Sequence, residues 1–528
     1  MTLLEKLTFH TQHTPDKIAL EFLDPPRQTL TYAELDQEIA RAATRLDQPG
    51  LRAGDRLALQ LPKTLDFILL HLAAMRMGAV TLPLNPAYPP DELAYFLRDS
   101  EASLFFADVA TQERLQPVLE TIPTLRQTIW LDSANLQISN LQVSNPTNQQ
   151  THQPTNPQIS NLQSSLENSK FPIANSPFPI NSPAVMIYTS GTTGRPKGAV
   201  LTHANLTAQT EALHTAWGWQ TDDILLHVLP LFHVHGLFVA LHGALYAGAT
   251  TLLFRQFDAR RTLQTLAERR CTVFMAVPTI HRRLLDVPDA TQFDLAHMRL
   301  LTSGSDRLPD EVFTGFQQTF GHTLLERYGM TETGMNLSNP LHGERRMGSV
   351  GLPLPGVEAR IAHPDTDEPL PDGEVGLVQI RGPHVFTEYW RQPEKTAEAF
   401  TPDGWLRTGD LGFRAPDGYF TLQGRAKDLI ITGGLNVYPP EVERVLADHP
   451  AVAANAVIGC PDPEWGEKIV AVVVPRAGVE ISENELIEYC QSKLARYKSP
   501  RRIVFAPDLP RNAMGKVQKM DLRKGVCV

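Results

Sequence analysis

The sequence has little cysteine and no excess of positive charge, and each shortage narrows the class of protein. Its 528 residues include four cysteines and no CxxC pair, the four being Cys271, Cys460, Cys490 and Cys527. Scattered cysteines without a pairing pattern favour a reducing compartment, so we expect a cytoplasmic protein. The formal net charge is −10, which argues against a nucleic-acid-binding protein because such proteins normally carry a basic face.

Long apolar runs are also missing from the N-terminus, which has early acidic residues and no signal-peptide pattern. One later stretch, residues 224–254, contains no Asp, Glu, Lys or Arg and is long enough to cross a bilayer. The same stretch holds polar and turn-forming residues, namely His227, Pro230, His233, His235, Gly236, His242, Gly243 and Gly248. These residues favour buried helix and strand around a site over a membrane span.

The chain is too long for one hydrophobic core, so we expect at least two domains. Helical and strand-like patterns alternate over residues 1–130 and again over 184–423, which predicts an α/β fold with mostly parallel sheets. Glycine and proline punctuate short strands over 351–381 and predict a β-rich piece within this large N-terminal domain, residues 1–423. A compact α+β unit over 424–528 has the size of a small second domain.

Residues 133–183 differ from both domains in composition. They are rich in Asn, Gln, Ser and Pro, and QISNLQ occurs twice, at 137–142 and 158–163. Such a segment buries too little apolar surface to offset the entropy lost on ordering. We interpret it as a disordered, exposed insertion, and a binding tail is the alternative.

Some element boundaries can be read from capping signals. Thr31 with Glu34 and Ser482 with Glu485 have the spacing of capping boxes, each of which predicts a helix start. A strand over 298–302 ends at Gly304 and Ser305. In open α/β sheets pocket residues gather at such strand ends, so these two residues are candidate ligand contacts.

The stretch YTSGTTGRPKG, residues 188–198, follows the apolar run 184–187 and precedes a predicted helix. Its glycines allow backbone N–H groups to approach a polyphosphate, and Arg195 and Lys197 supply positive charge. It is not a Walker A loop, because Gly194 is followed by Arg195 rather than by Lys-Ser/Thr. A glycine-rich surface turn is the alternative.

Five motifs in order make the chain resemble the adenylate-forming superfamily, which includes acyl-CoA synthetases, adenylation domains and luciferases. They are YTSGTTGRPKG, ERYGMTE at 326–332, WLRTGDLG at 405–412, GRAKDLIITGG at 424–434 and PRNAMGKVQK at 510–519. The resemblance implies a two-step reaction. A carboxylate attacks the α-phosphate of ATP to give acyl-AMP and pyrophosphate, and the thiol of CoA then displaces AMP.

The resemblance also assigns roles to individual residues. Lys516 would bridge the carboxylate and the α-phosphate, while Lys519 and Lys524 are interpreted as solvated lysines. Glu332, beside Thr331, would bind Mg²⁺. Tyr328 and Gly329 would face the adenine, and Asp410, assisted by Arg425, would bind the ribose. The phosphates would be held by Thr189, Ser190, Gly191, Thr192, Thr193, Gly194 and Lys197.

Lys427 matches the hinge position of the family. The resemblance implies that residues 424–528 form a mobile domain that rotates about this residue. One state presents Lys516 to the active site, and the other brings Gly433 and Gly434 to the tunnel for the pantetheine arm of CoA.

Acyl specificity depends on three further stretches. In LPLFHVHGL, His233 matches a histidine that lines the acyl or thiol channel of CoA ligases. His233 and His235 lack a third ligand for a metal site, so a core or pocket role is favoured. VPTIHRRLL and the polar stretch after Glu332, which includes Met335, are similar to malonyl-CoA synthetases. In that subfamily the arginine that matches Arg283 holds the distal carboxylate of malonate. The alternative for Arg283 is an exposed residue on a surface helix.

Asp306 and Arg307 depart from the family, which often has a small residue and then proline here. We expect Asp306 to lie near the adenine or the acyl group. The sequence thus predicts an acid–CoA ligase that uses ATP, Mg²⁺ and CoA, with malonate favoured and methylmalonate second. The alternatives are a medium-chain or aryl acid–CoA ligase, and an adenylation enzyme that loads a carrier protein in trans.

Overall fold

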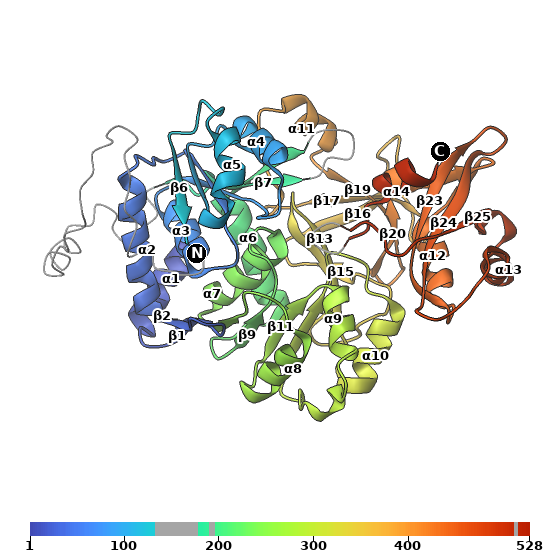
Figure 1. The fold of residues 1–528 in the computed structure, drawn as a ribbon, viewed down its shortest axis with the longest axis horizontal. Coiled ribbons are helices and arrows are strands. Elements are labelled where there is room, and N and C mark those ends of the chain that lie inside the picture. Colours follow the sequence, from blue (N-terminus) through green and yellow to red (C-terminus); the bar gives the residue numbers. More distant parts are fainter. Residues whose placement is uncertain (133–177, 190–195, 512–515, 528) are drawn as a thin grey trace, which may run out of the picture.

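A computed structural model describes residues 1–132, 178–189, 196–511 and 516–527. Four sheets organise these residues (Figure 1). The predicted α/β architecture is confirmed, with a large N-terminal part that contains three of the sheets and a smaller C-terminal part that contains the fourth. Most of the predicted insertion, residues 133–177, lies outside the described residues, which resume at Phe178, five residues before the predicted end.

The first sheet has nine strands, six of which run parallel in its centre, with antiparallel strands at both edges. In spatial order they are β15 (Leu352–Pro353), β14 (Gly334–Ser338), β13 (Leu325–Met330), β12 (Leu300–Ser303), β11 (Val273–Ala276), β9 (Ile224–His227), β10 (Thr250–Leu253), β1 (Ile18–Phe22) and β2 (Gln28–Thr31). The carboxyl end of β12 lies beside the start of β13, where Ser303 pairs with Glu326. Ligand sites of such sheets lie at carboxyl ends of strands.

The second sheet has seven strands and is parallel except at one edge. Its strands are β18 (Glu388–Tyr389), β8 (Lys197–Thr202), β7 (Pro183–Thr189), β4 (Val80–Pro83), β3 (Arg56–Gln60), β5 (Leu104–Asp108) and β6 (Gln127–Leu131). The short β18 comes from far along the chain and pairs with β8. This pairing places residues near 389 beside the end of residues 188–198, the predicted phosphate loop.

Helices cover both sheets and fill the layer between them. The N-terminal ones are α1 (Leu3–His13), α2 (Tyr32–Asp47), α3 (Leu65–Arg76), α4 (Pro90–Asp99), α5 (Gln112–Leu119), α6 (His203–Trp217), α7 (Gly243–Ala247), α8 (Ala259–Glu268), α9 (Pro278–Leu285), α10 (Asp310–Phe320), α11 (Pro393–Ala399) and the 3₁₀ turns η1 (Val109–Thr111) and η5 (Ala290–Gln292). Nearly every residue of α3 is buried, which identifies it as a core helix. Thr31 and Glu34 form the predicted capping box of α2.

The charge-free stretch 224–254 forms β9, the π-helix η4 (His235–His242), α7 and β10, and almost all of it is buried. Within the residues that the structure describes, no helix is long and apolar enough to cross a membrane. A Cβ added at Gly236 would lie 2.0 Å from the carbonyl oxygen of Pro230, so only glycine allows η4 to pack this closely. The prediction of buried helix and strand is confirmed.

The predicted β-rich piece belongs to a third, antiparallel sheet made of β16 (Glu358–Ala362), β17 (Gly376–Arg381), β19 (Leu406–Arg414) and β20 (Phe420–Arg425). The 3₁₀ turn η6 (Ala426–Asp428) then leads into the fourth sheet. That sheet contains β21 (Ile430–Thr432), β22 (Leu435–Val437), β23 (Val452–Asp462), β24 (Gly466–Pro475) and β25 (Arg502–Phe505).

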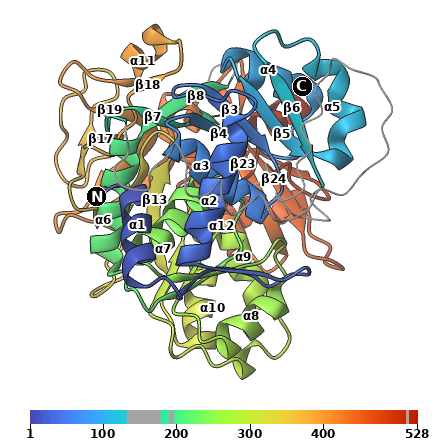
Figure 2. The same ribbon diagram turned by 90° about the vertical axis from the view of Figure 1, so that its left-hand side faces the viewer.

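The C-terminal part also contains α12 (Pro439–Ala447), α13 (Glu483–Lys493), η7 (Arg496–Lys498) and α14 (Lys519–Val526). Ser482 and Glu485 cap α13 as predicted. Figure 1 shows this part to one side of the N-terminal sheets, and in the turned view of Figure 2 it lies behind them. Its hydrophobic clusters contain only residues after 429.

Two of the four cysteines form a pair that the sequence did not predict. Cys460 on β23 and Cys527 after α14 form a disulfide, with Cα atoms 5.2 Å apart, while Cys271 and Cys490 are free and buried. The pair is 67 residues apart in sequence, and it becomes adjacent only because α14 packs on β23. The disulfide removes the cysteine argument for a reducing compartment.

Candidate active site

The predicted ribose and adenine contacts meet between β13 and β19. The Tyr328 hydroxyl donates to Oδ2 of Asp410 at 2.5 Å, and Nε of Arg425 lies 2.8 Å from Oδ1 of the same carboxylate. Asp410 is only 6% exposed. Burial and the neighbouring Asp410 charge raise the pKa of Tyr328 far above its usual value, so this phenol stays a hydrogen-bond donor. The arrangement holds a carboxylate ready for two hydroxyl groups.

Glu332 lies against the end of the phosphate loop. Its carboxylate is 6% exposed, and its Oε1 accepts a hydrogen bond of 2.9 Å from the Tyr389 hydroxyl. The ammonium of Lys197 lies 4.0 Å from the centre of the Tyr389 ring. Burial raises the pKa of Glu332 and lowers that of Lys197, and each charge partly offsets the shift of the other. Thr331, the neighbour of Glu332, is half-buried.

A single carboxylate of this kind fits Mg²⁺. Among the described residues there is no cluster of three or more His, Cys, Asp or Glu side chains that could hold a metal. Mg²⁺ in nucleotide enzymes usually takes one or two carboxylates together with phosphate oxygens and water. Because Tyr389 occupies Oε1, the second oxygen of Glu332 is the one suited to a cation. Bound there, Mg²⁺ would neutralise phosphate charge.

The phosphate loop is flanked by a strand pair. Thr189 ends β7, Lys197 begins β8, and the two residues are paired across this antiparallel ladder. Ser190, Gly191, Thr192, Thr193 and Gly194 lie outside the described residues. The carbonyl of Pro196 accepts a 2.7 Å hydrogen bond from the Tyr95 hydroxyl, which fixes the exit of the loop. The predicted role of the loop stays a prediction, with Lys197 placed beside Glu332.

The predicted acyl-side residues gather where β12 ends. His235 is 1% exposed, and its Nδ1 lies 3.3 Å from the Ser305 hydroxyl. The His235 backbone N–H donates to Nδ1 of His233 at 3.3 Å. Burial lowers the pKa of His233 to about 4 and that of His235 well below its usual value, with the Arg327 charge as the second cause for both. Both rings are therefore neutral near pH 7.

Two glycines make close backbone approaches in the same region. A Cβ at Gly304 would lie 2.4 Å from Cζ of Arg327, and one at Gly329 would lie 1.9 Å from the carbonyl of Gly334 and 2.5 Å from Cε of Met335. Met335 is 3% exposed and packs in the large core cluster. The predicted residues Gly304, Ser305, His233 and His235 are brought together.

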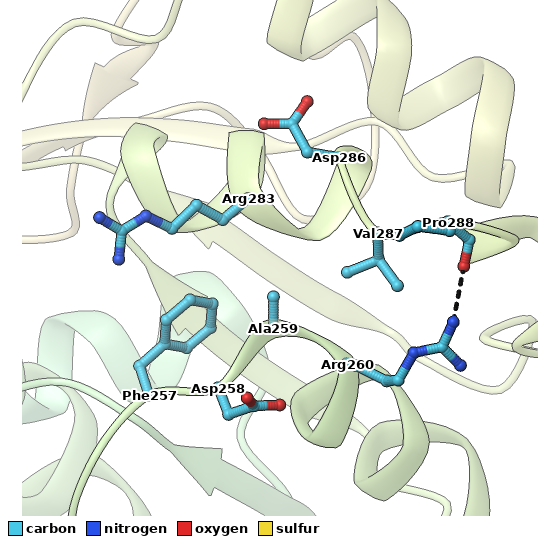
Figure 3. A pocket seen from close by; sticks show the side chains of 8 residues that line it. All are labelled: Phe257, Asp258, Ala259, Arg260, Arg283, Asp286, Val287 and Pro288. Atoms are coloured by element: carbon cyan, nitrogen blue, oxygen red, sulfur yellow. Dashed lines mark hydrogen bonds between the residues drawn. The ribbon is translucent and has the colours of Figure 1, made fainter.

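Unlike the buried residues at the end of β12, Arg283 lies at the surface. It is exposed on α9 and lines a surface pocket of about 390 Å³. The wall residues are Phe257, Asp258, Ala259, Arg260, Arg283, Asp286, Val287 and Pro288. Figure 3 shows its guanidinium extending along α9, away from the Arg260–Pro288 hydrogen bond of 3.0 Å. Its neighbour Arg282 pairs with Glu311. The predicted contact of Arg283 with substrate stays a prediction.

Lys516 and the predicted hinge residue Lys427 are both exposed. Lys516 is exposed and near enough to Asp306 that its charge lowers the pKa of that carboxyl, against a larger rise caused by burial. Lys427 is exposed in η6, and the Lys516 charge acts on it as well. Asp306, the departure from the family pattern, therefore lies within range of the Lys516 charge.

Lys519 differs from its prediction as a solvated lysine. Its ammonium forms a 2.6 Å ion pair with Glu443, and its side chain is 17% exposed. Lys524 is 74% exposed, as expected of a solvated residue. Gly433 and Gly434 form the turn between β21 and β22, both with positive φ. The flanking Ile431 and Leu435 are exposed by 52% and 48%.

Sequence reasoning missed two side chains of this site. Tyr389 belongs to a two-residue strand after the motif regions, and no local pattern marks it as a partner of Glu332. Arg327 lies inside the quoted motif ERYGMTE but was given no role. Its position directly before Tyr328, a predicted adenine contact, was the available signal. In chemical terms the described residues offer an ammonium beside a buried carboxylate, Lys197 with Glu332, and a second buried carboxylate at Asp410. Such groups suit nucleotidyl transfer to a carboxylic acid.

The comparisons with known proteins agree with this chemistry. The AMP-binding enzyme family matches residues 7–390, and the AMP-binding enzyme C-terminal domain matches residues 441–516. The chain belongs to the AMP-binding enzyme family. It is an acid–CoA ligase, and it resembles ligases that are named for different acids.

Three relatives cover almost the whole chain of this AMP-binding enzyme. Mouse malonate–CoA ligase ACSF3, a mitochondrial protein, is 36% identical over 94% of this chain and 86% of its own. Sulfoacetate–CoA ligase of Cupriavidus necator is 36% identical over 99% and 97%. The ATP-bound crystal structure of MatB from Rhodopseudomonas palustris has a TM-score of 0.89 and 38% identity, over 100% of this chain and 99% of that one.

The pairing of Tyr389 with Glu332 leads to a test. We expect Tyr389→Phe to lower kcat/KM for ATP about ten-fold, because a hydrogen bond to a charged group contributes about 1.5–3 kcal/mol. Initial rates of pyrophosphate release at varied ATP measure this. Tyr419→Phe is the control, since the Tyr419 hydroxyl donates to the carbonyl of Glu344. Equal rates for Tyr389→Phe and the wild type would remove Tyr389 from the site.

Proposed function

We propose that this enzyme is a malonate–CoA ligase that uses ATP, Mg²⁺ and CoA. The observation that carries the proposal is the similarity along nearly the full length to malonate–CoA ligases. The acyl side of the site supports it, because a buried arginine, Arg327, stands beside His233 and His235 where a fatty-acid enzyme would need an apolar wall. Methylmalonate is the second substrate that we propose.

The first step joins the acid to AMP. One carboxylate of malonate attacks the α-phosphorus of ATP, a P–O bond forms, and the bond to the β-phosphate oxygen breaks to release pyrophosphate. Lys516 would hold the attacking carboxylate and the α-phosphate together and so reduce their repulsion. Asp410 would accept hydrogen bonds from the ribose, and Lys197 would neutralise the leaving phosphates.

The second step needs another surface over the same acyl group. We propose that residues 424–528 rotate about Lys427 and that the turn at Gly433 and Gly434 then guides the pantetheine arm. The CoA thiolate attacks the acyl carbonyl, and the bond to AMP breaks. The exposed Ile431 and Leu435 beside the turn support this proposal, because apolar side chains at a loop tip are suited to a second docked position.

This reasoning predicts the effect of Leu435→Asp. We expect about a ten-fold or larger loss of thioester formation from supplied malonyl-AMP and CoA, with pyrophosphate release from ATP and malonate within about two-fold of the wild type, because burying an unpaired carboxylate is costly. Single-turnover assays of each step measure the two effects. Val479→Asp, another exposed apolar position of the C-terminal part, is the control. Equal losses in both steps would contradict the docking role.

Pyrophosphate release with a panel of acids tests the proposed function itself. The panel is malonate, methylmalonate, sulfoacetate, acetate, octanoate and coumarate, each with and without CoA. We expect the highest kcat/KM with malonate and CoA-dependent release of AMP. Preference for octanoate or coumarate would favour the medium-chain or aryl alternative. Turnover with a carrier protein and none with CoA would favour the adenylation enzyme.

A further inference from the structure

Arg327 is a buried cation without a counter-ion in the part of the chain that the structure describes. It lies on β13 and is 3% exposed. Its Nε and Nη2 atoms are fully buried and have no hydrogen-bond partner. A guanidinium has five N–H donors, and burying the three on these two atoms without a partner is costly. Such a group is more readily explained by a missing anionic ligand than by a contribution to stability.

The nearest acid does not satisfy Arg327. Glu326 precedes it on the strand, so the two side chains point to opposite faces of the sheet. Oε1 of Glu326 accepts a 2.9 Å hydrogen bond from the backbone N–H of Leu308 instead. Burial raises the pKa of Glu326 to about 7, and burial lowers that of Arg327 to about 9. Arg327 is thus still positively charged near pH 7, while Glu326 is partly protonated.

The surroundings of the guanidinium suit an anion. Its Cζ and Nη1 lie 2.4 Å from the position of a Cβ at Gly304, so the group rests on the bare backbone where β12 ends. His235 faces the same charge, and its buried Nε2 has no hydrogen-bond partner. The neighbouring Ser305 hydroxyl lies 3.3 Å from Nδ1 of His235. By donating to Nδ1 it would leave the single proton of the neutral ring on Nε2, where it can be donated to an anion. Hydrogen-bond donors and positive charge therefore gather at the end of β12. They lie on the opposite face of the sheet from the Tyr328–Asp410 pair, because Arg327 and Tyr328 are consecutive residues of β13.

We propose that Arg327 is the specificity-determining residue that receives the second anionic group of the acid substrate, a carboxylate or a sulfonate. The inference rests on the proposed function, in which the other end of the substrate is the reacting carboxylate. A guanidinium can bind two oxygens of either group through parallel N–H bonds. Within the residues described, Arg327 is buried and lies on a strand, whereas Arg283 is exposed on a short helix.

The decisive experiment compares charged and neutral acids of similar shape. Wild type, Arg327→Met, Arg327→Lys, Arg283→Met and Arg282→Met are assayed for pyrophosphate release with malonate, sulfoacetate and 3-methylbutyrate, which replaces the distal carboxylate of malonate with an isopropyl group. Arg282 is the matched control on α9, because it pairs with Glu311. The apparent Tm of each variant is measured with and without malonate.

For Arg327→Met we expect kcat/KM for malonate to fall about 10²–10³-fold, while kcat/KM for 3-methylbutyrate stays within about five-fold or rises. The KM for ATP should be unchanged. Arg327→Lys should retain part of the malonate activity, since lysine keeps the positive charge but lacks the two parallel N–H donors of a guanidinium. The apparent Tm should not fall, because methionine removes an unpaired buried charge, and malonate should no longer raise it.

Other results separate this inference from the proposed function. If the wild type uses malonate and Arg327→Met keeps that activity, or loses malonate and 3-methylbutyrate in parallel, the inference is wrong and the proposed function stands. If Arg283→Met alone loses malonate activity, the inference about Arg327 is also wrong and the proposed function stands. That result would support the prediction from the sequence that Arg283 binds the distal carboxylate. If the wild type uses sulfoacetate only and Arg327→Met loses it, the inference stands and the proposed function is wrong. Preference of the wild type for 3-methylbutyrate overturns both.

Discussion

Lys516→Ala is expected to reduce acyl-adenylate formation by about 10²–10³-fold, the usual effect of removing one electrostatic contact to a reacting group. The reason is that the attacking carboxylate and the triphosphate repel each other, and Lys516 is the cation that the resemblance assigns to the space between them. Its exposed position, close enough to Asp306 for the two charges to interact, suits that role. ATP–pyrophosphate exchange with malonate measures this step.

The same variant should form malonyl-CoA from supplied malonyl-AMP at a rate within about three-fold of the wild type, since that step would use the other position of the C-terminal part. Lys524→Ala is the appropriate control, because Lys524 is 74% exposed. Lys519→Ala is less suitable, since Lys519 is paired with Glu443. Equal losses in both half-reactions would refute the assigned role of Lys516.

Much of the fold follows from local signals in the sequence. The capping boxes at Thr31 and Ser482 mark helix starts because a side chain and a backbone N–H only three residues away satisfy each other. The parallel strands follow from apolar runs alternating with helical patterns. Such signals depend on neighbours in the chain, and the structure agrees with them at these places.

The disulfide and the contact of Tyr389 with Glu332 depend instead on residues that are far apart in the chain. Cys460 and Cys527 meet only after α14 packs on β23. Tyr389 reaches Glu332 only because β18 pairs with β8 across almost 190 residues of chain. No spacing rule in the sequence encodes such pairings, so they could not be predicted without the tertiary structure.

The two arginines of the acyl side illustrate a different limit. Arg283 was predicted as the substrate contact because a family motif marks it, and the structure exposes it on α9. Arg327 carried no family role, yet it is the one that the fold buries without a partner. Burial and missing hydrogen-bond partners result from tertiary packing. A motif therefore identifies the residue type at a position but not whether the fold buries its charge without a partner.

Glu332→Gln is expected to lower kcat/KM for ATP about 10²–10³-fold, because the amide keeps the shape of the carboxylate but loses the charge that Mg²⁺ requires. The wild-type pH profile provides a second readout. Burial is the main cause that raises the pKa of Glu332, so on acidification the carboxylate takes up its proton above the usual glutamate value of about 4.3. Activity should therefore fall as the pH drops through this raised pKa.

This acid limb belongs to the free enzyme and is seen in kcat/KM for ATP. Tyr389→Phe removes a hydrogen bond that stabilises the carboxylate form, so it should move the limb to higher pH, while Glu332→Gln should abolish it. Asp403→Asn, a change at an exposed carboxylate paired with Arg360, should leave the profile unchanged. A limb that is identical in the wild type, Tyr389→Phe and Glu332→Gln would show that another group titrates, and Glu332 would then lose its role as the metal carboxylate.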